Sequence, residues 1–257
     1  MMHLNYTELG QGRNIIILHG LFGSARNWQG IARALGEKHH VITPDLRNHG
    51  QSPHAATMSY QDMADDVIAI ADKLKLNDII IVGHSMGGKV AMTAALSNPE
   101  RFTALAVVDI APVNYDHDFS VLIAAMNSLN LAALKTRAQA EEALNKVIDD
   151  KAVIQLLLQN LVRSGKAFKW RINLEGILGN LNLIGQFPES LKSSSCRLPT
   201  LFLGGSESDY MRSIHNPAIY EQFPSAEITM INGAGHWLHA EKPTEFLKHL
   251  KTFINFV

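Results

Sequence analysis

Short apolar runs rich in isoleucine, valine and leucine recur along the chain, separated by segments in which apolar residues return every three or four positions. The runs lack the polar alternation of a half-exposed strand, which is typical of strands buried on both faces of a parallel sheet. The segments between them have the period of amphipathic helices. The pattern therefore predicts an α/β domain with a largely parallel sheet. The expected strands span residues 15–18, 41–43, 79–82, 105–108, 200–203 and 228–231, with an edge hairpin from residues 3–9 before the turn at residues 10–12.

Several of the expected helices carry start or stop signals in the sequence. Ser24 can cap a helix that follows it, and Ser59 and Asp62 have the spacing of a capping box. Pro99 is expected to end the helix that begins at the glycine-rich turn near residue 85. The last helix opens near Pro243 and keeps one apolar face to the end of the chain.

Residues 113–191 depart from this alternation, because they hold helical patterns only and no apolar run of strand quality. A crossover between parallel strands normally needs one helix, so we interpret the block as a cap over the carboxyl ends of the strands, where open α/β sheets bind ligands. Helices that merely flank the sheet are the alternative. The predicted domains are a core of residues 1–112 and 192–257 and a helical cap insertion of residues 113–191.

The apolar faces of this cap would suit an acyl or aryl group. Its large apolar side chains are candidate walls of a substrate pocket, with packing inside the cap as the alternative interpretation. The candidates are Phe119, Met126, Phe168 and Trp170.

A glycine-rich segment, Gly83-His84-Ser85-Met86-Gly87, lies between the apolar run 79–82 and a helical pattern. A G-x-S-x-G sequence between a buried strand and a helix is typical of a nucleophile elbow. The glycines leave room for a sharp turn, and the helix N-terminus favours negative charge beside the serine. Ser85 is therefore the candidate nucleophile.

Because a serine hydroxyl is not ionised at neutral pH, Ser85 needs a base within hydrogen-bond reach. His236 fits, since it lies in the glycine-rich loop Gly233-Ala234-Gly235-His236-Trp237 after the last expected strand. His84 would point away from the serine side chain, and we assign it a structural role. His239 follows His236 by three residues, but no carboxylate or cysteine lies at a matching metal-ligand spacing, so no metal site is expected.

Two positions could supply the acid that orients His236. Asp109 ends the strand at residues 105–108, and Asp209 lies in the loop Gly204-Gly205-Ser206-Glu207-Ser208-Asp209 after the next strand. Position after the cap favours Asp209, although its surroundings also have the composition of a simple turn. A carboxylate at the buried end of an apolar strand, as at Asp109, is costly unless it is paired. The residues alone leave both open.

The segment His19-Gly20-Leu21-Phe22-Gly23 follows the first central strand. Loops of this kind supply one backbone N–H of an oxyanion hole, while the residue after the nucleophile supplies the other. The expected donors are the backbone N–H of Met86 and that of Leu21 or Phe22.

The chain has 257 residues, a formal net charge of -1 and 46% hydrophobic residues. A net charge this close to zero does not indicate nucleic-acid binding. The apolar run at residues 15–18 is too short to span a membrane. The single cysteine, Cys196, excludes an internal disulfide and fits a reducing compartment. The first residues lack the basic and apolar regions of a secretory signal, so we expect a cytoplasmic protein. The oligomeric state stays open.

Together these segments resemble the α/β-hydrolase superfamily from residue 4 to the C-terminal end. With Asp45-Leu46-Arg47-Asn48-His49-Gly50-Gln51-Ser52 and Val108-Asp109-Ile110-Ala111-Pro112-Val113, the motifs resemble the YbfF-type bacterial esterases and the related abhydrolase-domain 11 proteins. The resemblance implies that Asp109 is the acid, because that family uses the aspartate of this segment. The carboxylates at residues 207 and 209 depart from the family pattern and keep Asp209 as a rival.

The expected activity is hydrolysis of small acyl esters, extending to acyl-CoA thioesters, through an acyl-enzyme on Ser85 with no cofactor. An acyltransferase with the same Ser85–His236–Asp109 triad is the alternative. A non-catalytic binding protein would be expected to lose a member of the constellation, and none is lost. Dehalogenase and epoxide hydrolase chemistry would require an aspartate nucleophile at position 85, so Ser85 argues against both activities.

Overall fold

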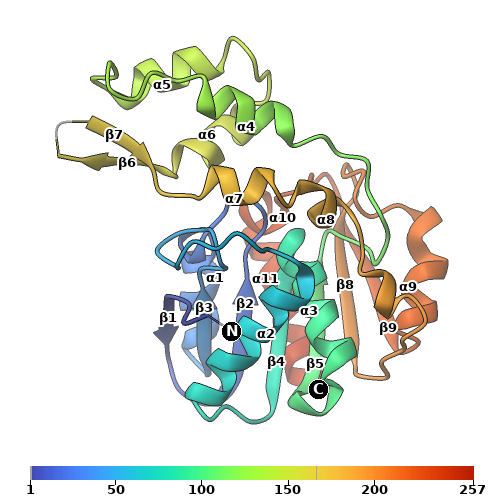
Figure 1. Cartoon of the computed structure of the whole chain (residues 1–257). Coiled ribbons are helices and arrows are strands. Elements are labelled where there is room, and N and C mark those ends of the chain that lie inside the picture. The colour runs from blue at the N-terminus through green and yellow to red at the C-terminus, as the bar shows by residue number, and fades with distance from the viewer. Residues whose placement is uncertain (1, 166) are drawn as a thin grey trace.

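A seven-stranded sheet forms the centre of the protein in the computed structural model, which describes residues 2–165 and 167–257 (Figure 1). Residues 1 and 166, which fall in the predicted core and cap, lie outside the described residues. The strand order is β1-β3-β2-β4-β5-β8-β9, and all neighbours except β1 and β3 pair in parallel. This confirms the predicted fold class. The strands are β1 (Tyr6–Leu9), β2 (Arg13–Leu18), β3 (His39–Pro44), β4 (Ile79–His84), β5 (Phe102–Val108), β8 (Thr200–Gly205) and β9 (Ala226–Ile231).

The expected edge hairpin is wrong in its pairing. β1 is an edge strand, but it runs antiparallel to β3 rather than to β2, the strand that follows it in sequence. Both edges of β2 are already occupied, by β3 and by β4. The chain therefore passes the end of β3 at Gly10, which has φ +73° and where a Cβ would overlap the backbone of Gly36 and His39.

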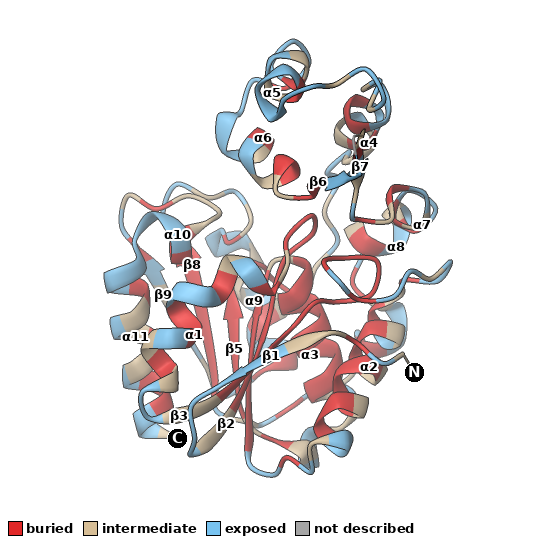
Figure 2. Cartoon of the chain, turned by 90° about the vertical axis from the view of Figure 1, so that its left-hand side faces the viewer, coloured by how far each residue is buried: buried red, intermediate tan, exposed pale blue. Residues whose placement is uncertain are grey.

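Helices cover both faces of the sheet, so the strands are buried between two layers (Figure 2). In β2, Ile15 and Ile17 pack with one face, whose helices are α1 (Gln29–Gly36) and α11 (Pro243–Phe256). Ile16 and Leu18 pack with the other face. The continuous apolar runs follow from this two-sided burial. The remaining core helices are α2 (Tyr60–Lys73), α3 (Met86–Ser97), α9 (Asn216–Gln222) and α10 (Leu238–Glu241).

The predicted helix ends are largely confirmed. The Ser59 hydroxyl accepts the Asp62 N–H, and the Asp62 carboxylate accepts the Ser59 N–H, so α2 opens with a capping box. α3 ends two residues before Pro99, and α11 begins at Pro243. Ser24 precedes a short 3-10 helix, Ala25–Trp28, which leads into α1.

The segment between β5 and β8 lies largely beyond the carboxyl ends of the strands (Figure 1). The expectation that it holds helices only is wrong, because it also contains a two-stranded antiparallel hairpin. Helix α6 ends at Leu158, and Leu161, although apolar and close to that helix in sequence, pairs with Trp170 in the hairpin. Its elements are α4 (Ser120–Asn127), α5 (Arg137–Leu144), α6 (Lys151–Leu158), β6 (Leu161–Ser164), β7 (Ala167–Trp170), α7 (Leu174–Leu178) and α8 (Leu181–Gly185).

Asparagine side chains attach this segment to the loop after β3. Asn48 has φ +67°, and its buried side-chain oxygen accepts hydrogen bonds from Ala55 N–H (2.7 Å) and Asn173 Nδ2 (2.9 Å). Asn180 accepts the Met58 N–H (3.1 Å) and donates to the carbonyl oxygen of Ala56 (2.7 Å). These bonds fix α7 and α8 over the core. Across residues 2–165 and 167–257, no helix has the length and apolar character needed to cross a membrane.

Candidate active site

Ser85 occupies a sharp turn between β4 and α3, with φ 52° and ψ −121°, which a non-glycine residue rarely adopts. The neighbouring glycines make this turn possible. A Cβ on Gly83 would overlap the carbonyl of Gly87, and a Cβ on Gly87 would lie 2.5 Å from the His19 carbonyl oxygen. Backbone strain of this kind costs about 1–3 kcal/mol and persists where the surroundings enforce it. The turn places Ser85 at the N-terminus of α3, on the wall of a large cavity.

His236 and Asp109 form a close pair in this region. Nδ1 of His236 lies 2.7 Å from Oδ2 of Asp109, and the Asp109 side chain is fully buried. The same carboxylate accepts the Gly205 N–H at 3.0 Å and the Ser208 hydroxyl. Asp109 itself has φ 51°, which turns the chain at the end of β5. The buried Asp109 carboxylate therefore has three hydrogen-bond donors as partners, so its burial leaves it with polar contacts.

The loop that carries His236 is held from several sides. The Glu241 carboxylate accepts the N–H groups of Gly235 (2.7 Å) and Trp237 (3.1 Å), on either side of the histidine. His84 Nε2 bonds the His236 carbonyl oxygen at 2.8 Å. The Tyr210 ring stacks on the His236 imidazole at a centroid distance of 3.9 Å. The imidazole therefore has one supported orientation.

The rival carboxylate lies elsewhere. Asp209 and Glu207 are both exposed, and both are among the residues that line the cavity. The observed partner of the His236 ring is Asp109, which follows β5, one strand of the central sheet before the strand that Asp209 follows.

The loop His19-Gly20-Leu21-Phe22-Gly23 packs directly against the nucleophile turn. A Cβ placed on Gly20 would lie 3.3 Å from the Ser85 Cβ and 3.0 Å from His84 Nδ1. The Phe22 N–H is already occupied, because it donates to His49 Nε2 at 3.2 Å. This leaves Leu21 as the better placed of the two expected donors.

Two buried histidines fix this loop through their unprotonated nitrogens. His49 accepts the Phe22 N–H and donates from Nδ1 to the Arg47 carbonyl oxygen (2.9 Å). His19 accepts the Leu46 N–H at 2.9 Å. Desolvation lowers the pKa of both rings, that of His49 to about 3, so they remain neutral acceptors at neutral pH.

The cavity has a volume of about 850 Å³ and is bounded by the core on one side and by α4 and α6 on the other. Of the four candidate wall residues, Phe119 lines this cavity, together with Leu122, Val153 and Leu156. The other three candidate wall residues are absent from the cavity lining and pack within the segment between β5 and β8 instead. Trp170 donates its indole N–H to the Met126 carbonyl oxygen at 3.1 Å, and Phe168 is buried beneath the Arg163 guanidinium.

His239 has a structural environment. Its ring stacks on Trp28 at a centroid distance of 4.3 Å, and its buried Nδ1 has no hydrogen-bond partner in the described part of the chain. Within residues 2–165 and 167–257, no three His, Cys, Asp or Glu side chains gather in a way that could hold a metal ion.

Burial of His239 makes stability depend on pH. Desolvation, with His236 nearby, lowers the pKa of His239 to about 3, whereas the unfolded chain takes up the proton near pH 6.5. The folded state therefore loses stability as the pH falls from 6.5 toward 3, by about 1.4 kcal/mol per pH unit. Between pH 7.5 and pH 5, the free energy of unfolding should fall by about 2 kcal/mol less in His239→Leu than in the wild type, as measured by urea unfolding. The exposed His3→Leu is the control, and a pH dependence of His239→Leu parallel to the wild type would contradict the assignment.

Sequence reasoning missed two residues beside the Asp109–His236 pair. Ser208 bonds the carboxylate, and Tyr210 covers the imidazole face. Ser208 directly precedes Asp209 and Tyr210 directly follows it, so this part of the chain supports the pair through a hydroxyl and a ring rather than through its carboxylates.

Known proteins share the sequence and the fold of this chain. The family described as alpha/beta hydrolase fold matches residues 13–243. The chain is 40% identical over 253 residues to the sn-1-specific diacylglycerol lipase ABHD11 of Danio rerio, covering 95% of this chain and 79% of that protein. It is 35% identical over 247 residues to the esterase YbfF of Escherichia coli K12, covering 94% and 92%. A marine microorganism esterase of known structure superposes with a TM-score of 0.95 at 38% identity, covering 98% of this chain and all of that one.

The resemblance inferred from the motifs is thus confirmed over almost the whole chain. With the family match and relatives of this similarity, the protein belongs to the alpha/beta-hydrolase family and is a carboxylic ester hydrolase of the esterase and lipase class.

Proposed function

We propose that Ser85 is the nucleophile, His236 the general base and Asp109 the acid of this ester hydrolase. The observation that carries the proposal is the buried Asp109–His236 pair at the wall of the cavity into which the strained Ser85 turn opens. Asp109 holds the proton of His236 on Nδ1, so Nε2 is free to take the proton of the serine hydroxyl. The rival acid, Asp209, has no comparable support because it is exposed.

In the first step Ser85 Oγ attacks the acyl carbon while His236 accepts its proton. The carbonyl oxygen becomes negative and is bound by the backbone N–H groups of Met86 and Leu21, the second chosen because His49 occupies that of Phe22. His236 then protonates the leaving alcohol. Water attacks the acyl-enzyme by the same route and releases the acid. Replacement of Ser85 is the direct test.

We also propose that residues 113–191 act as a cap that encloses the substrate over this machinery. α4 and α6 supply apolar walls to the cavity, and the asparagine contacts at Asn48 and Asn180 keep the segment in place. A closed apolar wall of this kind excludes water from the acyl group.

The same triad chemistry serves oxygen esters and thioesters, but the charge of the cavity favours neutral leaving groups. Its described lining residues include the carboxylates of Asp150, Glu207, Asp209 and Glu241 and no lysine or arginine. The phosphates of coenzyme A would meet negative charge there, which like-charge repulsion disfavours. Acyl-CoA thioesters are therefore the secondary substrate class and neutral esters the primary one.

This ranking predicts that kcat/KM for butyryl-CoA is lower than for the S-butyryl thioester of N-acetylcysteamine, a neutral fragment of the same thiol. We expect a difference of about tenfold at low salt, which shrinks as ionic strength rises, since screening weakens the repulsion. The double variant Glu207→Gln/Asp209→Asn removes two of the carboxylates, so it should reduce the difference in kcat/KM between the two thioesters. Equal values for the two thioesters at low salt would refute the electrostatic argument.

A further inference from the structure

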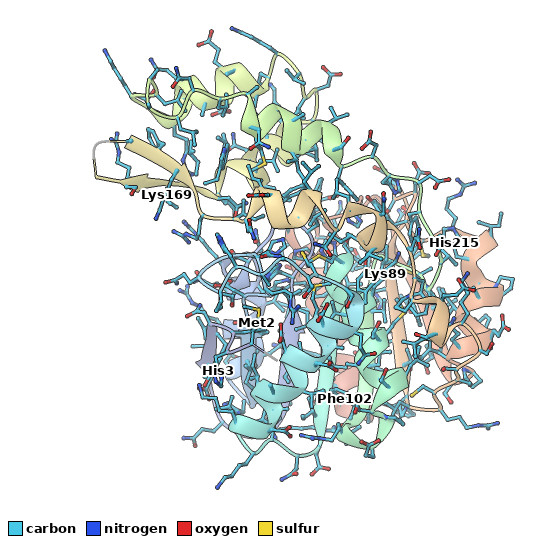
Figure 3. All side chains as sticks on the ribbon, in the orientation of Figure 1. Met2, His3, Lys89, Phe102, Lys169 and His215 are labelled. Carbon is cyan, nitrogen blue, oxygen red and sulfur yellow. The ribbon has the colours of Figure 1, made fainter. Side chains whose placement is uncertain are left out.

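Lys89 is a buried lysine one helical turn after Ser85 on α3. Its side chain is 1% exposed, and its backbone N–H donates to the Ser85 carbonyl oxygen at 3.1 Å. Figure 3 shows it where the upper end of α3 meets the segment that carries α8. Among the described residues no carboxylate forms a salt bridge with it. A buried ammonium without a carboxylate is costly unless other groups compensate it.

The compensation comes from backbone carbonyls and tyrosine rings. Nζ of Lys89 donates to the carbonyl oxygens of Gly185 and Gln186, both at 2.9 Å. It also lies 5.6 Å and 5.0 Å from the ring centroids of Tyr60 and Tyr115, within the range of cation–π attraction. Desolvation still lowers the pKa of Lys89 to about 7. These contacts all serve to join α3 to the end of α8.

Two tyrosines bind the same end of α8, Tyr60 from α2 and Tyr115 from the segment that follows β5. The Tyr60 hydroxyl donates to the Ile184 carbonyl oxygen at 2.5 Å, and the Tyr115 N–H donates to that of Gly185 at 2.9 Å. Three successive carbonyls, at residues 184, 185 and 186, are therefore held by the core. We call these contacts the α8 anchor, with Lys89 at its centre.

The α8 anchor borders a small second cavity beside Ser85. Its volume is about 20 Å³, about the space that one water molecule or a methyl group needs, against about 850 Å³ for the large cavity. Ser85, Leu21 and Phe119 line both cavities. Ser85 thus stands between a large and a small space.

The proposed chemistry assigns the two halves of an ester to these spaces. The leaving oxygen must receive a proton from His236, which lines the large cavity, so the alcohol lies there. The carbonyl oxygen points at Met86 and Leu21, and Met86 lines the small cavity. The acyl chain is the remaining substituent of the acyl carbon, and the small cavity is the second space that Ser85 lines, so we place the acyl chain there. Lys89, Ile184 and Gly185 are among the residues that line this small cavity.

We propose that Lys89 is a positioning residue that sets acyl-chain length: by fixing the end of α8 it keeps the acyl side short, so the enzyme prefers short acyl groups on bulky alcohols. The inference rests on the proposed function, because it uses the roles of Ser85 and His236. A longer acyl chain fits only when the α8 anchor is loosened.

The test compares p-nitrophenyl acetate with p-nitrophenyl octanoate, which share a leaving group. We expect the wild type to favour the acetate in kcat/KM by about tenfold or more, the discrimination that one or two methylenes give in a fitted pocket. Lys89→Met keeps the side-chain length but removes the hydrogen bonds. It should shift the ratio toward the octanoate by about tenfold, mainly through a lower KM for the octanoate.

Lys73→Met is the matched control. Lys73 is exposed on α2, and its ammonium lies 5.1 Å from the centroid of the Tyr6 ring of β1. Its replacement removes a lysine–tyrosine contact far from α8, so the selectivity should stay unchanged. Tyr60→Phe is a second variant that removes one bond of the α8 anchor and leaves the ammonium in place. It should shift the ratio in the same direction by a smaller factor.

Hydrogen exchange separates this inference from the proposed function. Lys89→Met and Tyr60→Phe should speed amide exchange in residues 181–187 and at Tyr115, whether or not any ester is hydrolysed. A folded Lys89→Met with wild-type exchange there, or with the wild-type acetate-to-octanoate ratio, overturns the inference. A wild type that hydrolyses neither ester refutes the proposed function, and the exchange data then still decide whether the α8 anchor exists.

Discussion

Ser85→Ala is expected to lower kcat for p-nitrophenyl butyrate by about 10⁴-fold or more, leaving the rate supported by the oxyanion donors and binding alone. The alanine removes the only atom that forms the acyl-enzyme bond in the proposed mechanism. It retains the Cβ and therefore the strained backbone of the turn, so the folded structure should persist. Initial rates and labelling by a fluorophosphonate probe, followed by mass spectrometry of the Ser85 peptide, measure the effect.

Ser97→Ala is the control for this variant. Ser97 is exposed at the other end of α3, the helix that begins beside Ser85, and should keep wild-type rates and labelling. A folded Ser85→Ala protein that hydrolyses the ester at the wild-type rate would eliminate the proposed nucleophile.

Asp109→Asn should reduce kcat by about 10³- to 10⁴-fold with little change in KM, because an amide cannot hold the required His236 tautomer. The new NH₂ group would also face donors at Gly205, Ser208 or His236, and an unsatisfied buried donor costs about 1–3 kcal/mol of stability. Thermal unfolding must therefore accompany the kinetics, at a temperature where the variant is folded.

Asp209→Asn is the matched substitution, since it makes the same chemical change in an exposed residue that lines the same cavity. It should retain kcat within about threefold, as expected for an exposed charge outside the hydrogen-bonded pair. If kcat instead falls strongly in Asp209→Asn and stays near the wild-type value in Asp109→Asn, Asp209 is the acid.

The sheet could be predicted because two-sided burial leaves a direct trace in sequence. β2 is apolar from Ile15 to Leu18 and β4 from Ile79 to Val82. The turn at Ser85 is marked by glycines at which a Cβ would overlap neighbouring backbone. Capping at Ser59 is equally local. Each of these features depends on residues that are close together in the chain.

The missed features depend on pairing between distant segments. β6 is four residues long and half exposed, so only its pairing with β7 identifies it as a strand. The choice between Asp109 and Asp209 was open for the same reason, because the donors to Asp109 lie 96 residues away at Gly205, the end of β8, and 99 residues away at Ser208, in the loop after it. Likewise, sequence spacing could not separate Phe119, on the cavity wall, from Met126 and Trp170, which bond to each other inside the cap.

The chain leaves the core after β5 and returns to it at β8, and these two strands are hydrogen-bonded neighbours, with Asp109 N–H bound to the Leu203 carbonyl at 2.8 Å. Whatever is inserted between them begins and ends at one place in the sheet. Directed evolution could therefore exchange residues 113–191 for the corresponding segment of a relative as a single graft. The junctions would stay closed by the β5–β8 pairing, and the groups around Asp109 would keep their partners while the new segment brought its own substrate range.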